Sequence, residues 1–219
     1  MYAPGDDGRI PVVAVTGTNG KTTTARLITH LFASSGLRVG MTNTDGVYVN
    51  GRQIDSGDCS GPRSARNVLM HPDVDAAVFE TARGGVLREG LGFDRCQVAV
   101  VTNIGAGDHL GLNYITTVED LAVLKRVIVQ NVAATGYAVL NAADPIVAGM
   151  AAVCPGQVIF FAADRQHPPQ GGTEELEGHD AKSHLADERF LLWCKRTKPG
   201  SQFLDAHRHG LEVRRKRHC

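Results

Sequence analysis

The chain has 219 residues, with 23 basic and 23 acidic side chains that give a formal net charge of zero. This length suits one ordinary domain with an appendage, and 42% hydrophobic residues are enough to bury a core. Balanced charge provides no overall field that favours nucleic acid or an anionic membrane surface, so we expect neither as a partner. No apolar run approaches the roughly 18 residues needed to span a bilayer.

The five cysteines are scattered and lack CxxC spacing. This usage is typical of reduced thiols in a cytosolic protein, rather than of a disulfide framework or a zinc site. The first ten residues are polar and have no signal-peptide apolar stretch. We therefore expect a cytoplasmic protein.

Short apolar runs alternate with helical patterns from about residue 10 to residue 163. Strands are predicted at residues 11–16, 38–44, 76–80, 97–102, 137–140 and 158–161, and helices at 21–34, 118–131 and 144–153. Asn50-Gly51, within the alternating stretch 47–54, predicts a β-hairpin. The predicted apolar face of the first helix consists of Ala25, Leu27, Ile28, Leu31 and Phe32. The alternation predicts an α/β fold: a doubly wound, mostly parallel sheet with helices on both faces.

The composition divides the chain into three parts. Residues 1–9 are predicted to be a linker, and residues 10–163 an ATP-binding domain. Residues 164–219 are rich in charge and histidine and end in a basic run at 214–218. We interpret them as an irregular, weakly ordered tail, with a nucleic-acid or targeting role for the basic run as the alternative.

A phosphate-binding loop is indicated where the first strand meets the first helix. Its glycines let backbone N–H groups turn onto phosphate oxygens, and the helix N-terminus adds partial positive charge. Lys21 is suited to neutralise the β- and γ-phosphates of ATP, and the Thr22 hydroxyl to ligate Mg²⁺. Val15 replaces the first glycine of the usual GxxxxGK[ST] pattern, and the alternative is a glycine-rich turn with a surface lysine. The predicted nucleotide-binding residues are Gly17, Thr18, Asn19, Gly20, Lys21, Thr22 and Thr23.

Two polar residues follow the next apolar strands. Glu80 ends the strand at 76–80, where its burial costs free energy unless a cation such as Mg²⁺ pairs with it. His109 lies in a glycine-rich loop after the strand at 97–102, at the edge where ligands bind in this architecture. It is a candidate for binding a second Mg²⁺ or for orienting substrate. The alternatives are a surface acid and an ordinary loop histidine, and Lys125 taken alone is a solvated helix lysine.

The motifs GTNGKTTT, FETARGG, DHLG and VEDLAVLK together resemble the Mur ligase superfamily, which includes the peptidoglycan amino-acid ligases and folylpolyglutamate synthetase. The resemblance is greatest to the Mur-like half of the cyanophycin synthetase branch. It covers roughly residues 10–163, with the motifs in the family's order, and implies the fold of a Mur ligase central domain.

The resemblance implies an acid–amino-acid ligase that forms an amide (peptide) bond. ATP phosphorylates a carboxylate, and an amine attacks the acyl phosphate. For the cyanophycin synthetase branch, the implied carboxylate is the aspartate side chain of a poly-aspartate peptide, and the implied amine belongs to arginine.

The resemblance also implies roles for residues of the site. Lys21 would hold the phosphates, Thr22 and Glu80 the first Mg²⁺, and His109 the second Mg²⁺, helped by Lys125 as a carbamylated lysine. Asn141 and Asp144 would lie near the adenine. Arg63 and Arg83 are the candidate contacts to substrate carboxylates, although residues 58–63 are equally consistent with the start of a capped helix.

The sequence departs from the family pattern in three respects. Ala143 replaces the first aspartate of the NADD motif, and no stretch resembles the ATP-grasp half or the closing C-terminal domain. We therefore expect a fragment with inefficient turnover of its own, because water reaches an uncovered acyl phosphate. The alternatives are a nucleotide-binding module without independent ligase activity, and a phosphate-loop kinase or GTPase, for which an NKxD signature is missing. Apolar surface exposed by missing domains favours a homo-oligomer.

Overall fold

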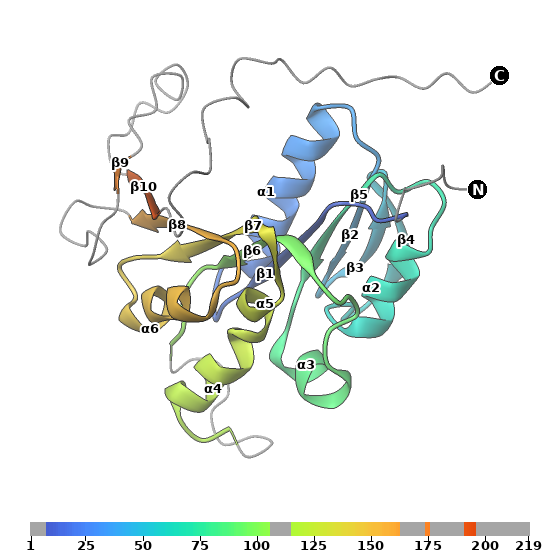
Figure 1. Cartoon of the computed structure of the whole chain (residues 1–219). Helices are drawn as coiled ribbons and strands as arrows, with labels where there is room; N and C mark the ends of the chain where they lie inside the picture. The colour runs from blue at the N-terminus through green and yellow to red at the C-terminus, as the bar shows by residue number, and fades with distance from the viewer. Residues whose placement is uncertain (1–7, 106–114, 163–173, 176–190, 196–219) are drawn as a thin grey trace.

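The computed structural model describes residues 8–105, 115–162, 174–175 and 191–195, and a sheet forms the middle layer of this part of the chain (Figure 1). The strands lie in the order β4-β3-β2-β5-β1-β6-β7-β8-β10-β9. Strands β2, β5, β1, β6, β7 and β8 are parallel to their neighbours in that order, whereas β3, β4, β10 and β9 pair antiparallel. The predicted mostly parallel α/β sheet is confirmed.

Most predicted elements are present with small shifts at their ends. The strands are β1 (Val12–Thr16), β2 (Val39–Asn43), β3 (Gly46–Val49), β4 (Arg52–Ser56), β5 (Ala76–Glu80), β6 (Cys96–Val101), β7 (Val132–Asn141), β8 (Gln157–Ala162), β9 (Glu174–Glu175) and β10 (Leu191–Lys195). The helices are α1 (Lys21–Ser34), α2 (Pro62–Leu69), α3 (Arg83–Glu89), α4 (Val118–Lys125), α5 (Val127–Gln130) and α6 (Pro145–Gly149), followed by the 3-10 turn η1 (Met150–Val153). The predicted hairpin is β3–β4.

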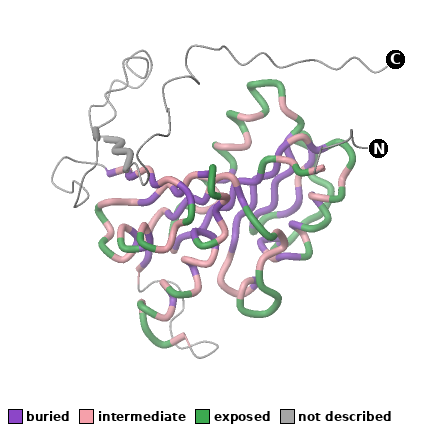
Figure 2. Tube along the Cα trace, viewed as in Figure 1, coloured by how far each residue is buried: buried purple, intermediate pink, exposed green. Residues whose placement is uncertain are grey.

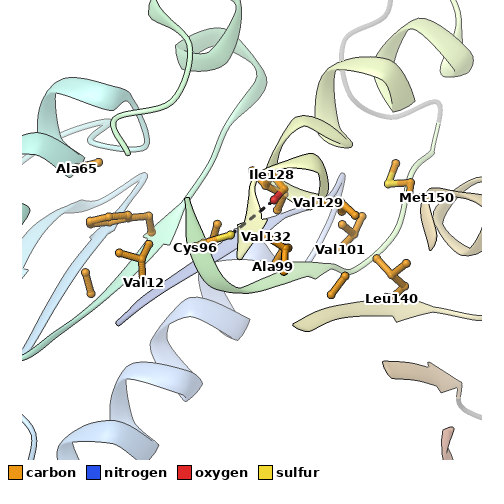
Figure 3. Packing of buried hydrophobic residues seen from close by; sticks show 14 of the residues in the cluster. Val12, Ala65, Cys96, Ala99, Val101, Ile128, Val129, Val132, Leu140 and Met150 are labelled. Carbon is orange, nitrogen blue, oxygen red and sulfur yellow. Dashed lines mark hydrogen bonds between the residues drawn. The ribbon is translucent and has the colours of Figure 1, made fainter. Parts of the chain in front are cut away.

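Helices cover both faces of the sheet, as predicted. On one face, α1 packs Ala25, Ile28 and Phe32 against side chains of β1, β2, β5 and β6. On the other face, α2, α4, α5 and α6 cover the larger core, part of which Figure 3 shows around Leu140 and Ile128. The strands between these layers are largely buried, and the outer sides of the helices are exposed (Figure 2). The buried sheet is therefore a rigid base for the loops at its edges.

The predicted apolar face of α1 is wrong at two positions. Leu27 and Leu31 are 58% and 59% exposed. Only a stripe around Ala25, Ile28 and Phe32 reaches the sheet, and Leu27 lies about 200° around the helix from Ala25. Apolar spacing alone made the stripe too wide.

Two further differences concern helices. The helix predicted at 118–131 divides at Arg126 into α4 and α5, and α4 begins with a capping box between Thr117 and Asp120. Helices α2 and α3 were not among the predicted elements, although a helix start was the second interpretation of residues 58–63. Helix α2 does begin at Pro62, after an N-cap Gly61 that makes no side-chain cap. Its start depends on the fixed backbone of proline rather than on a polar cap.

Strands β9 and β10 lie within the predicted tail, whose other residues fall outside the described part of the chain. The domain boundaries at residues 10 and 163 stay predictions. None of the helices in the described ranges is long and apolar enough to cross a membrane.

Candidate functional site

The candidate site lies where four neighbouring parallel strands end. Strands β5, β1, β6 and β7 are adjacent and point the same way. Their carboxyl ends are followed by Glu80, the phosphate loop, the segment 102–105 and Asn141. The register places Val15 beside Glu80 and Thr16 beside Val101. The sheet order therefore brings these segments to one edge, although they are far apart in sequence.

Two glycines set the path of the phosphate loop. Gly17 has a φ of +149°, and a Cβ there would collide with the hydroxyl oxygen of Thr102. Gly20 has a φ of +79° and is the N-cap of α1, which begins at Lys21. Because the first N–H groups of a helix have no acceptor within the helix, the start of α1 presents donors to an anion. The loop is thus built as a phosphate-binding loop is expected to be.

Three successive carbonyl groups of the loop are held by side chains. The oxygen of Gly17 accepts from Lys125 Nζ at 2.7 Å, that of Thr18 from Lys21 Nζ at 2.9 Å, and that of Asn19 from Thr102 Oγ1 at 2.7 Å and Asn103 Nδ2 at 3.2 Å. These bonds define the loop conformation without a ligand. They also place the ammonium groups of both lysines at the loop.

Glu80 and Thr22 form a polar pair at the end of β5. Glu80 is 1% exposed, and its Oε2 accepts a hydrogen bond of 2.8 Å from Thr22 Oγ1. Its other oxygen, Oε1, is buried and has no hydrogen-bond partner among the described residues. Burying such an oxygen is costly unless a cation or a water meets it. A carboxylate and a hydroxyl are oxygen ligands of the kind that Mg²⁺ prefers, so this pair fits the ion.

Lys125 is buried rather than solvated. It is 3% exposed and lies on α4, so the sequence interpretation of a solvated helix lysine is wrong. It lines a small cavity together with Arg83, Thr16 and Thr81. Arg83, at the start of α3, is half-buried, whereas Arg63 on α2 is exposed. The fold brings Arg83, but not Arg63, close to Lys125.

Asn141 and Asp144 bond to the backbone at the other end of the site. Asn141 Nδ2 donates to the carbonyl of Thr102 at 3.0 Å, and its Oδ1 accepts from the N–H of Ala143 at 2.9 Å. Asp144 is the N-cap of α6. Their placement near an adenine stays a prediction, as do the roles of the other site residues. His109 lies outside the described residues.

The segment 102–105 was not named from the sequence as part of the site. Its residues bond to the phosphate loop at several points, including Thr18 N to Asn103 O at 2.8 Å and Asn19 N to Asn103 Oδ1 at 3.0 Å. The available signal was its position directly after a buried strand next to the strand of the phosphate loop. Neighbouring strand order, which periodicity does not reveal, was the missing information.

Comparisons with known proteins agree with this architecture. The model of the Mur ligase middle domain matches residues 15–201. The cyanophycin synthetase of Synechocystis sp. is 50% identical over 168 residues, which are 77% of this chain and 19% of that protein. This chain therefore spans about a fifth of the length of that relative.

Two solved structures share the fold. A UDP-N-acetylmuramoyl-L-alanyl-D-glutamate–2,6-diaminopimelate ligase is 26% identical, with a TM-score of 0.59, over 69% of this chain and 31% of its own. A bifunctional folylpolyglutamate synthase/dihydrofolate synthase, solved with Mn, AMPPNP and L-glutamate bound, is 19% identical with a TM-score of 0.51, over 71% of this chain and 46% of its own. The extent of the middle-domain match and the identity to cyanophycin synthetase show that this chain belongs to the Mur ligase family.

Proposed function

We propose that this chain binds Mg-ATP at its phosphate loop and serves in ATP-dependent amide bond formation of the cyanophycin synthetase type. The observation that carries the proposal is the convergence of Lys21, Thr22 and the buried Glu80 at the start of α1. The 50% identity to a cyanophycin synthetase supports the ligase type. The structure of the same fold solved with Mn and AMPPNP is consistent with a metal–nucleotide complex.

In the proposed reaction, a carboxylate oxygen of the substrate attacks the γ-phosphorus of ATP and ADP leaves. An amine then attacks the carbonyl carbon of the acyl phosphate, inorganic phosphate leaves, and the nitrogen loses a proton. Lys21 and the N–H groups at the start of α1 would bind the phosphates. Thr22 and Glu80 would hold Mg²⁺, which when bound offsets the negative charge of the phosphates. His109 and a carbamylated Lys125 are the proposed ligands of a second Mg²⁺.

The proposed substrates are the aspartate side chain of a poly-aspartate peptide and the amine of arginine. This assignment rests on the relationship to cyanophycin synthetase. Arg83 and Arg63 are the proposed partners of substrate carboxylates, since a guanidinium binds a carboxylate with two parallel hydrogen bonds. Arg83 is the stronger candidate because it lines the cavity beside Lys125.

Calorimetric titration of Mg-ATP tests the proposal, with a Lys21→Ala variant and an Arg52→Ala control that removes an exposed cation from β4. We expect binding by the parent and the control, and its loss in Lys21→Ala. Release of ADP that depends on arginine and an aspartate peptide would then establish ligation. Binding without that release would identify a nucleotide-binding module, and a folded parent that does not bind Mg-ATP would refute the proposal.

A further inference from the structure

The segment 102–105 connects the phosphate loop to the start of α6. On the side of the phosphate loop, Thr18 Oγ1 accepts from the N–H of Gly105 at 2.9 Å, in addition to the bonds that Thr102 and Asn103 make with Thr18 and Asn19. Thr18 and Asn19 are therefore held by three consecutive residues of this segment together with Thr102. The position of the phosphate loop depends on the position of the segment.

The segment is in turn held by two side chains that follow β7. Asn141 donates to the carbonyl of Thr102, and Asp144 Oδ2 accepts from the N–H of Ile104 at 2.7 Å. Ile104 is 8% exposed, so its N–H has little access to water. A hydrogen bond to a carboxylate is among the stronger ones in proteins, and leaving a buried N–H unpaired is costly.

The carboxylate of Asp144 is almost fully used by the protein itself. Its Oδ1 accepts from the N–H groups of Ile146 at 3.0 Å and Val147 at 3.2 Å, which caps α6. With the bond from Ile104, three of the roughly four acceptor sites of a carboxylate are occupied. These bonds connect one side chain to the helix after β7 and to the loop after β6.

We propose that Asp144 is a positioning residue of the phosphate loop: it acts through Ile104 and the segment 102–105 rather than by binding the nucleotide itself. The connection runs from α6 through the Asp144 carboxylate to Ile104, then through Asn103 and Gly105 to Thr18 and Asn19. Asn141 supports the same segment from β7. The consequence for nucleotide affinity rests on the proposed function, whereas the effect on loop rigidity does not.

Two substitutions separate the bond to Ile104 from the cap of α6. Asp144→Asn keeps one oxygen for the cap but replaces the other by an NH₂ group, which cannot accept from Ile104. Asp144→Ser provides a good N-cap whose hydroxyl is too short to serve both partners. Asp120→Asn is the matched control, because Asp120 lies in the capping box of α4 and bonds only to Thr116 and Thr117 among the described residues.

The measurement is amide hydrogen exchange of the nucleotide-free protein, followed by titration with Mg-ATP. We expect the amides of Thr18, Asn19 and Ile104 to exchange about tenfold faster in Asp144→Asn and Asp144→Ser, with unchanged protection in β1, because one buried bond is lost locally. The dissociation constant for Mg-ATP should rise by about tenfold in both variants and stay unchanged in Asp120→Asn.

Unchanged exchange at Thr18 and Asn19 would overturn the proposal. Weaker Mg-ATP binding without faster loop exchange would also overturn it, since Asp144 would then be a direct nucleotide ligand. Faster loop exchange in a protein whose parent does not bind Mg-ATP would uphold the positioning role and refute the proposed function.

Discussion

The hydroxyl of Thr22 donates a 2.8 Å hydrogen bond to Oε2 of Glu80 and so joins the first turn of α1 to the end of β5. The two residues are 58 positions apart in the sequence. The bond uses one carboxylate oxygen and leaves the other buried without a described partner. Both residues therefore converge on one place before any ligand is bound, which a site for a metal–nucleotide complex requires.

Glu80→Gln should remove stabilisation by Mg-ATP. Ligand at 100 times its dissociation constant stabilises a folded protein by about 2.7 kcal/mol, and a neutral amide is a poor substitute for a carboxylate ligand of Mg²⁺. Urea unfolding with and without Mg-ATP measures the gain. Glu89→Gln, which changes an exposed acid at the end of α3, should behave as the parent. Equal stabilisation of Glu80→Gln and the parent would exclude Glu80 as a ligand of the metal.

Gly17→Ala should destabilise the loop and the fold. The new Cβ would collide with Thr102 Oγ1 and lie 3.2 Å from the carbonyl oxygen of Asn103, and the φ of +149° is rarely adopted by alanine. Overpacking of this kind costs about 1–3 kcal/mol. Thermal and urea unfolding measure the loss. Gly105→Ala is the control, because a Cβ there meets nothing within 4 Å, and an equal loss in both variants would contradict the argument.

Cys96 should be unreactive in the native protein. Burial raises the pKa of its thiol to about 12, and its Sγ lies 3.6 Å from the carbonyl oxygen of Ile128 (Figure 3). Since the thiolate is the nucleophile, alkylation at pH 8 followed by mass spectrometry should label Cys96 only after unfolding. The raised pKa favours the protonated thiol in the folded state. This contribution to stability is complete below the unfolded value of about 8.5 and falls as the pH rises toward 12.

A Cys96→Ala variant should therefore lose less stability than the parent between pH 8.5 and pH 10.5. Urea unfolding across this range measures the difference. Native labelling of Cys96 as fast as that of an unfolded control would contradict the burial on which this expectation rests.

Asp75 should contribute to stability in a pH-dependent way. The side-chain hydrogen bond from Arg38 lowers the pKa of its carboxyl. Stability from the ionised form is complete above the unfolded pKa of about 3.9 and is lost as the pH falls through the lower folded value. Both side chains are partly exposed, so the contribution at pH 7 should be below about 1 kcal/mol. Unfolding of Asp75→Asn and the parent should differ at pH 7 and converge near pH 2; a pH-independent difference would contradict this.

Local features could be derived from the sequence. The phosphate loop was predictable because glycines, Lys21 and Thr22 stand between a strand and a helix, and the helix α1 was predicted with its observed ends. The parallel strands were predictable because strands buried on both faces are almost wholly apolar. Helices α2 and α3 were not predicted, since their glycines and proline are turn signals in a short window.

What the sequence determined by itself was the type of fold, the family and the chemical nature of the phosphate loop, because each depends on residues that are neighbours in the chain. Only the tertiary structure decided that Lys125 is buried against Gly17, that Leu27 and Leu31 are exposed, and that Asp144 accepts from Ile104. The physical reason is that these contacts follow from strand order and helix placement. They involve partners 40 and 108 positions apart, for which periodicity carries no information.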